Sequence, residues 1–164
     1  MKIASKHYIL IIVVLVLLSA CSTTKYVPDG SYLLDEVEIV TDNKELKPSE
    51  LSLYLRQKPN NKWFNLFKTQ LHIYSLSGRD STKWINKALR RVGDAPVIFS
   101  DLETRLTQDE LKKSINNRGY MSASVDYSTK VKKKKLKLTY HVTSGKPYRV
   151  RSISYRIPDK KVEE

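Results

Sequence analysis

Two stretches near the end of the chain alternate between core-facing and polar residues, which is the period of a half-buried β-strand. The core-facing positions are Val125, Tyr127, Thr129 and Val131 in the first stretch, and Leu136, Leu138, Tyr140 and Val142 in the second. Lysines fill the turn between them at 132–135. Because the two faces must meet the same core, the pattern predicts an antiparallel hairpin.

A similar alternation occurs near the start of the chain. Within 33–40, Val37 and Ile39 lie on one face, and Glu36 and Glu38 lie on the other. This predicts a first strand, half-buried and ended by the polar pair at 42–43. A last strand is predicted over 150–157, after the turn at 144–147. Its apolar residues change from an even position at Val150 to odd positions from Ile153 onwards, so in a regular strand they would face opposite sides. This change indicates a kink or the passage into another domain.

Helical spacing begins at Pro48, a residue favoured in the first turn of a helix. Leu51, Tyr54 and Leu55 form an apolar stripe, and Pro59 ends the predicted helix.

A second helix is predicted over 81–92, with Gly93 as its C-terminal stop. Its apolar face consists of Trp84, Ile85, Ala88, Leu89 and Val92. Two N-terminal capping boxes follow at 100–103 and 107–110. The second box is expected to open a further helix that closes near Gly119, with the glycine in a left-handed conformation.

The segment 62–77 is the most aromatic part of the chain and gives no clear period. We expect such a cluster to be core. The alternative is an interfacial segment on a bilayer, because tryptophan and phenylalanine beside lysine suit that depth.

The N-terminal region has the composition of a secretory signal, with Lys2 and Lys6 before an apolar run at 8–18. The run has 11 residues, whereas a transmembrane helix needs roughly 20. It ends in Leu-Ser-Ala-Cys, which resembles the lipobox of bacterial lipoproteins. The resemblance implies cleavage between Ala20 and Cys21 and a covalent lipid on Cys21. The alternative is an ordinary signal peptide with an incidental cysteine.

The formal charge of +13 would ordinarily suggest nucleic acid as a partner. Export argues against it, so we expect no nucleic-acid partner. Anionic lipid head groups, lipopolysaccharide or an acidic protein are better candidates, and a charge that merely aids solubility is the alternative. Cys21 is the single cysteine of the sequence, so no internal disulfide can form.

The sequence gives no sign of catalytic chemistry. His72 and His141 are isolated, and no metal-ligand spacing, nucleophile elbow or phosphate loop is present. The clustered carboxylates at 101–110 serve helix starts. We therefore expect no enzyme, no catalytic residue, no metal and no cofactor beyond the lipid. A hydrolase lipoprotein is the weaker alternative.

The order of elements is strand, helix, further helices, strand and strand. Gly119-Tyr120 leads into the second strand, and the segment 140–148 leaves the third. This resembles a POTRA domain, the periplasmic module of the BamA/TamA outer-membrane assembly factors, and most of all the TamL-like lipoproteins. The resemblance implies an α+β fold of β-α-α-β-β order, with a small mixed three-stranded sheet covered by helices and an enlarged helix–helix connection.

The expected organisation is a lipoprotein signal peptide at 1–20, a lipid-anchored tether at 21–30 and a POTRA-like domain at 31–148. Residues 149–164 would be the start of a second POTRA-like domain or a truncated tail. In the family, more POTRA domains and a membrane-embedded part follow, so we expect either a fragment of a longer protein or a truncated relative.

The resemblance implies a lipid-anchored module on the periplasmic side of the outer membrane. It would bind envelope proteins or unfolded outer-membrane clients. No aspartate follows the cysteine, and by resemblance to lipoprotein sorting patterns this favours the outer membrane. The alternative is a free-standing structural lipoprotein that binds peptidoglycan or lipopolysaccharide.

One strand is expected to lie at a sheet edge and to accept a partner strand. Its residues are Ser124, Val125, Asp126, Tyr127, Ser128, Thr129 and Lys130. Outward charges at Asp126 and Lys130 fit an edge, and a protected edge without a partner is the alternative. Of prolines at Asp126 or Ser128, only one whose N–H points outward should spare the fold.

Overall fold

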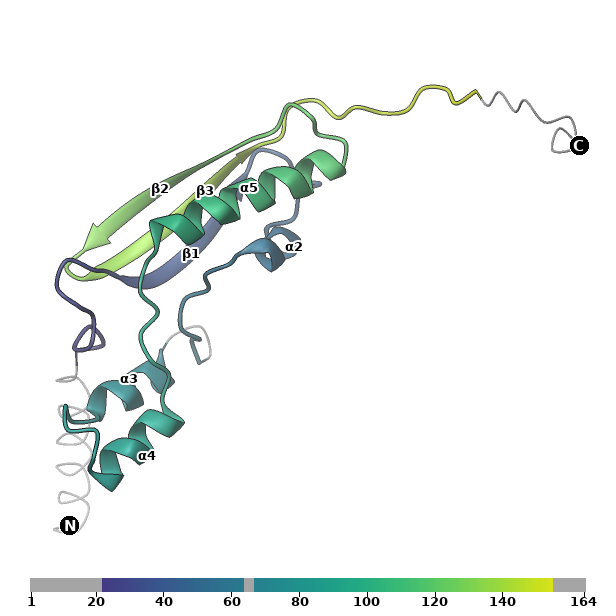
Figure 1. The fold of residues 1–164 in the computed structure, drawn as a ribbon. Coiled ribbons are helices and arrows are strands. Elements are labelled where there is room, and N and C mark those ends of the chain that lie inside the picture. Colours follow the sequence, from purple (N-terminus) through teal and green to yellow (C-terminus); the bar gives the residue numbers. More distant parts are fainter. Residues whose placement is uncertain (1–21, 64–66, 155–164) are drawn as a thin grey trace, which may run out of the picture.

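The computed structural model describes residues 22–63 and 67–154 (Figure 1). Its elements in chain order are β1 (Leu33–Thr41), α2 (Pro48–Leu51), the 3₁₀ turn η1 (Ser52–Tyr54), α3 (Thr69–Leu76), α4 (Trp84–Val92), α5 (Asp101–Asn117), β2 (Ser124–Lys132) and β3 (Lys135–Thr143). Helices and a small mixed sheet share one core. The predicted α+β class is therefore confirmed.

The three strands form one open sheet in the order β1-β3-β2. β1 runs parallel to β3 with Leu34 opposite Leu136, and β2 runs antiparallel to β3 with Val125 opposite Val142. The predicted hairpin is thus confirmed. Its two-residue turn contains Lys133, whose φ is 57°. β3, the last strand within the described ranges, lies in the middle of the sheet.

α2 and α5 lie on one face of the sheet and form the core with it (Figure 1). Leu111 and Ile115 of α5 are fully buried, as the predicted helix requires. Their neighbours in this core include Leu34, Leu46, Leu51, Tyr120, Val125, Leu136, Leu138, Tyr140 and Val142. The apolar parity of β2 and β3 therefore fixes which face of the sheet the helices cover.

The predicted start of the long helix is wrong by two turns. α5 begins at Asp101, and the Ser100 hydroxyl accepts a hydrogen bond from the Glu103 N–H at 3.4 Å. Thr107 lies inside the helix, where its hydroxyl donates to the Glu103 carbonyl at 2.8 Å. A threonine that bonds the preceding turn does not cap, so the first box opens the helix and the second does not.

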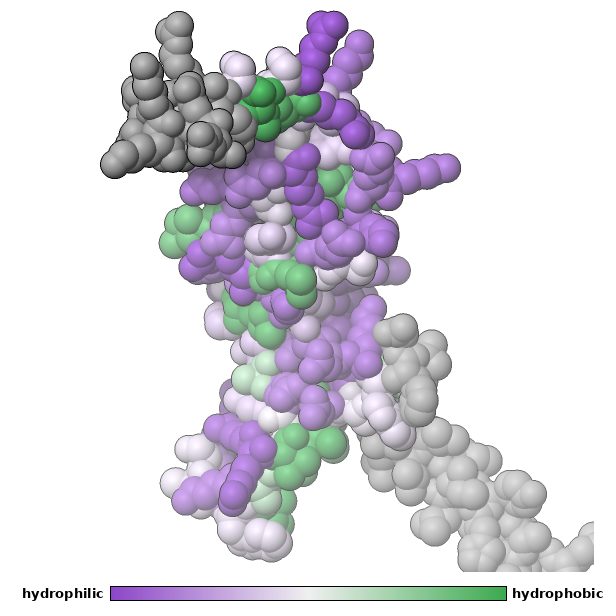
Figure 2. Space-filling view, turned by 90° about the vertical axis from the view of Figure 1, so that its right-hand side faces the viewer, coloured by the Kyte–Doolittle hydropathy of each residue, from purple (hydrophilic) through white to green (hydrophobic). Residues whose placement is uncertain are grey.

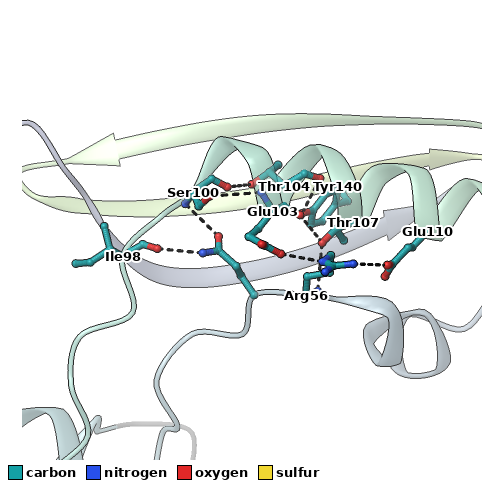
Figure 3. A network of polar contacts seen from close by, with 9 residues as sticks. Arg56, Ile98, Ser100, Glu103, Thr104, Thr107, Glu110 and Tyr140 are labelled. Atoms are coloured by element: carbon teal, nitrogen blue, oxygen red, sulfur yellow. Dashed lines mark hydrogen bonds and ion pairs between the residues drawn. The ribbon is translucent and has the colours of Figure 1, made fainter.

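The helix predicted from Pro48 is shorter than its apolar stripe suggested. α2 and η1 together end at Tyr54, and Leu55 is extended with a ψ of 118°. The chain turns there because Arg56 is held on α5. Its backbone N–H bonds the Thr107 hydroxyl, and its guanidinium bonds Glu103 and Glu110 at 2.8 and 2.7 Å (Figure 3).

The two ends of the long connection between η1 and α5 lie side by side and are hydrogen-bonded to each other. Gln57 donates to the Ile98 carbonyl and accepts from the Ser100 N–H, each at 3.1 Å (Figure 3). Asn60 in turn bonds the Ala95 carbonyl at 2.8 Å and the Val97 N–H at 3.1 Å. The helices α3 and α4 therefore form a hairpin that is joined to the rest of the domain by two adjacent chain segments, 57–60 and 95–98, which we call the stalk. The expected enlarged connection is confirmed.

The aromatic segment is not the core that we expected. Trp63 and Phe67 are 66% and 65% exposed, although Leu71 is fully buried. Leu71 belongs to a small second cluster with Val27 and Leu33, which joins the tether to the hairpin. Phe64 and Leu66 of this segment lie outside the described residues. None of the helices in the described ranges is long and apolar enough to cross a bilayer.

The last predicted strand is wrong for the part that the structure describes. Residues 149–154 lie in no helix or strand. Tyr148 donates its N–H to the Gly119 carbonyl at 2.7 Å, and beyond it no described strand pairs with the chain. A strand needs a hydrogen-bonding neighbour, which an alternating sequence alone cannot supply.

Candidate docking edge

β2 forms one edge of the sheet because β3 alone lies beside it. The seven candidate residues at 124–130 occupy this strand without interruption. An edge strand presents N–H and C=O groups that a further strand can pair with. Which residues present them follows from the phase of the β2–β3 ladder.

Lys132 and Lys135 flank a two-residue turn and must form a hydrogen-bonded pair. Antiparallel pairs alternate, so the main-chain groups of Lys130, Ser128 and Asp126 also point towards β3. Those of the residues between them point outwards, namely Val125, Tyr127, Thr129 and Val131. The bond from the Asp42 N–H to the Val142 carbonyl supports this phase, since Val142 then faces β1.

The helix α5 covers the first of the outward groups. The Gln108 side-chain amide donates to the Val125 carbonyl. Beyond this point no described side chain of α5 bonds the main chain of β2. In the described part of the chain, the outward main-chain groups of Tyr127, Thr129 and Val131 have no hydrogen-bond partner. The available edge is therefore the half of β2 nearest the lysine turn.

On the face of this edge that was predicted to meet the core, α5 holds Tyr127, whereas Thr129 and Val131 are exposed, so the expected core contact is wrong for these two residues. The Tyr127 hydroxyl donates to Asp101 at 2.8 Å, and Asp101 also pairs with Arg105 at 2.9 Å. The hydrogen bond to the Asp101 carboxylate raises the pKa of Tyr127, with burial acting in the same direction. The tyrosine ring thus has a fixed position beside the available edge.

The other face of β2 is open to solvent. Asp126, Ser128 and Lys130 are exposed, as their predicted outward positions require. The Ser128 hydroxyl lies 2.8 Å from His141 Nε2 on β3. A docked strand would therefore meet a polar surface on one side and Tyr127 on the other.

The opposite edge of the sheet is partly covered. The Leu34 N–H donates to the Val97 carbonyl at 2.8 Å, and Leu33 bridges Ile98. Lys68, which is 7% exposed, donates to both the carbonyl and the carboxylate of Asp35 at 2.5 and 2.9 Å. The start of β1 is thereby closed to a further strand.

Burial of the Asp35–Lys68 pair opposes its ionisation. For Asp35 the hydrogen bond and charge of Lys68 outweigh burial, so its pKa is lowered. For Lys68 burial dominates, and its pKa is lowered despite the aspartate. The pair attaches the long connection between η1 and α5, through Lys68, to β1 of the sheet.

The structure corrects the choice of proline positions. Asp126 and Ser128 are two residues apart and share one phase, and both N–H groups point into the sheet. Sequence reasoning did not identify Thr129 as a position where proline removes an outward N–H. It also did not identify Gln108 as the residue whose side chain bonds the outward carbonyl of Val125. Locating the turn at 133–134 would have given the phase, but the periodicity of side chains contains no signal for Gln108.

A lipid site at Cys21 and two isolated histidines were also named from the sequence. Ala20 and Cys21 lie outside the described residues, so the lipid site stays a prediction. His141 belongs to the β2–β3 face, away from His72 in α3. Among the described residues, no group of three histidine, cysteine, aspartate or glutamate side chains could hold a metal ion.

Comparison with known proteins identifies one family. The family model described as POTRA, surface antigen variable number repeat, matches residues 32–145, which is most of the chain. The match begins just before β1 and ends just after β3. No curated protein matches the sequence.

Proposed function

The chain belongs to the POTRA family, and from this premise we propose that it is a lipid-anchored module that binds polypeptides along β2 during outer-membrane protein assembly. POTRA domains are non-enzymatic scaffold domains of the periplasmic side of this machinery. They bind client polypeptides and partner proteins. The family match favours this role over a structural lipoprotein that binds peptidoglycan or lipopolysaccharide.

The single observation that carries the binding mode is the outward phase of Tyr127, Thr129 and Val131. Main-chain pairing would supply affinity for an extended segment of any sequence. The exposed charges of Asp126 and Lys130 would discourage uncontrolled pairing between copies. An edge of this kind suits a scaffold that receives many clients.

The anchor belongs to the same proposal. The resemblance of residues 18–21 to a lipobox supports a lipid on Cys21. As in TamL-like proteins, the tether at 22–30 would hold the POTRA domain at the periplasmic face of the outer membrane. Partners would then reach β2 from the periplasm.

Thr129→Pro tests the docking edge. Proline removes an N–H that points outwards, so we expect the variant to fold while crosslinks from a photoreactive residue at Lys130 to envelope proteins disappear. Thr129→Val keeps the N–H and should crosslink like the wild type. Ser128→Pro removes a bond to β3 and should destabilise the domain by about 3 kcal/mol. A folded Thr129→Pro variant with wild-type crosslinks would contradict docking at this edge.

A further inference from the structure

The helix α4 packs with its polar side inwards. Asn86 is its one buried residue among those described, and its amide accepts from the Gly78 N–H at 2.8 Å and donates to the Asp80 carbonyl at 2.6 Å. Arg90 donates to the Gly78 carbonyl at 2.9 Å. These bonds attach α4 to the loop that follows α3, and Leu89 is the one apolar side chain of α4 that is half-buried.

The apolar side of α4 is consequently left at the surface. Trp84, Ile85 and Val92 are 76%, 52% and 63% exposed, and Ala88 between them is exposed as well. Their spacing of one, four and eight residues from Trp84 defines a single helical face. Figure 2 shows hydrophobic surface beside hydrophilic surface at the lower end of the molecule, where Figure 1 places α3 and α4.

The charge around this face has one sign. The segment 61–93 contains seven lysines and arginines, but Asp80 is its only acidic residue. Lys87 and Arg91 lie on α4 and are exposed beside the apolar side chains. An apolar helical face flanked by basic residues and bearing a tryptophan is typical of a helix that lies in a membrane interface.

The described part of the tether packs on the same hairpin. Lys25 donates to the Ser77 carbonyl at 2.8 Å, and the Tyr26 hydroxyl donates to it at 2.5 Å. The Tyr26 ring packs edge-on against Tyr74 with centroids 5.4 Å apart. Lys25 and Tyr26 follow Cys21 by four and five residues in the sequence, so the predicted lipid would be attached close in sequence to this contact.

We propose that the exposed face of α4 lies in the interface of an anionic lipid bilayer, so that the α3–α4 hairpin is a second membrane contact. The proposal rests on the proposed function for one premise, the lipid on Cys21 that brings the hairpin to the bilayer. Trp84, Ile85 and Val92 would enter the head-group boundary. Lys87 and Arg91 would meet the anionic head groups, each contributing favourably to binding.

The two tryptophans of the sequence, Trp63 and Trp84, both lie at the hairpin, so fluorescence reports on it directly. The test uses the chain purified from membranes and reconstituted into phosphatidylethanolamine–phosphatidylglycerol vesicles, with Trp63→Phe to isolate Trp84. We expect a shift of Trp84 emission to shorter wavelength and quenching by lipids brominated near the head group. In phosphatidylcholine vesicles both effects should weaken.

A double variant with Ile85→Asn and Val92→Asn should lose the shift and the lipid quenching. Both sites are exposed, so circular dichroism should stay unchanged. Met121→Asn is the matched control, because Met121 is 63% exposed and follows the C-terminal end of α5, whereas the hairpin precedes its N-terminal end. It should behave like the wild type.

Trp84 that is quenched by iodide but not by brominated lipid would overturn the proposal and leave this face to a protein partner. Mass spectrometry of the N-terminal peptide reports separately on the lipid at Cys21. An unmodified cysteine would contradict the anchor of the proposed function, whereas unquenched Trp84 in a lipidated chain would contradict only the hairpin contact.

Discussion

Gly119 occupies a backbone position that other residues rarely adopt. Its φ is +93°, as the sequence around the end of α5 predicted. A Cβ at this position would lie 2.9 Å from the Tyr148 carbonyl oxygen. The same glycine accepts the Tyr148 N–H, so two segments depend on its conformation.

Gly119→Val should therefore destabilise the domain by about 2 kcal/mol, since it combines left-handed strain with a steric clash. Thermal or urea unfolding measures the effect. Met121→Val, two residues away at an exposed position, is the control and should change stability little. Equal unfolding midpoints for the two variants would contradict the role given to Gly119.

The Asp35–Lys68 pair makes stability depend on pH at the acid end. The pKa of Asp35 is lowered in the folded state, so its contribution is complete above its unfolded pKa of about 3.9 and is lost as the pH falls through the folded value. Asp35→Asn leaves the buried Lys68 ammonium without its counter-charge. We expect a loss of about 2 kcal/mol at neutral pH.

Unfolding by urea at pH 7 and at pH 3 measures this contribution. The wild type should lose more stability between these values than Asp35→Asn does, because the variant has no carboxylate to protonate. Asp126→Asn, at an exposed residue without an ion pair among the described residues, is the control. The same pH dependence in Asp35→Asn and in the wild type would count against the pair.

At the scale of elements, Gly93 sets how closely the two helices of the hairpin approach. A Cβ there would lie 2.4 Å from the Tyr74 nitrogen and 2.7 Å from the Gln70 carbonyl oxygen. The backbone cannot yield as a flexible side chain could. The end of α4 therefore packs on α3 only with glycine at this position.

Gly93→Ala should separate α4 from α3 at a cost of about 1–3 kcal/mol. Both tryptophans lie at the hairpin, so their emission should change on substitution, while β2 and β3 keep their hydrogen-exchange protection. Ala88→Ser on the exposed face of α4 should alter neither signal. Unchanged emission in Gly93→Ala would show that the helices do not require this contact.

The strands and the hairpin were predictable because a period of two assigns Val125, Leu136 and Leu138 to one face over a shared core. The strand order and the long connection were predicted from the resemblance to a POTRA domain, since side-chain periodicity gives neither. The phase at Thr129 was not predictable from side-chain periodicity, because it depends on where the two-residue turn lies. Sequence reasoning therefore found the strand but missed its outward groups.

The orientation of α4 shows a different limit. Its amphipathic pattern predicted the helix correctly, yet the pattern does not say which side is buried. Which side of the helix is buried depends on the segment that it packs against. Here Asn86 and Arg90 donate to the carbonyl groups of Asp80 and Gly78 in the loop that follows α3. Residue spacing likewise could not decide whether Ser100 or Thr107 caps the helix, since each is followed three positions later by a glutamate.

At the scale of the whole molecule, the helical hairpin lies at one end, and the sheet with its docking edge lies beyond the stalk (Figure 1). The lipid at Cys21 remains a prediction. We expect Cys21→Ser to abolish incorporation of labelled palmitate, because the serine hydroxyl cannot replace the thiol that the lipobox family modifies. Ser22→Ala keeps the cysteine and should be labelled like the wild type.

Fractionation of cells provides the second measurement. Several acyl chains exceed what stable anchoring needs, so the wild type should sediment with outer membranes. Palmitate labelling of Cys21→Ser at the wild-type level would contradict the assignment of the lipid site.

The central place of β3 also determines the order in which the domain can fold. Its pairing with β1 joins residues about one hundred positions apart, such as Leu34 and Leu136, whereas the tether and the hairpin meet over about fifty positions. In the export that the N-terminal pattern predicts, the N-terminus would emerge first, so the hairpin could dock on the tether while β1 still lacks its neighbour. Until Lys135 and the residues after it arrive, β1 and β2 share no strand between them. The unfinished sheet then exposes apolar surface in the periplasm, and a holding chaperone would have its binding window during that interval.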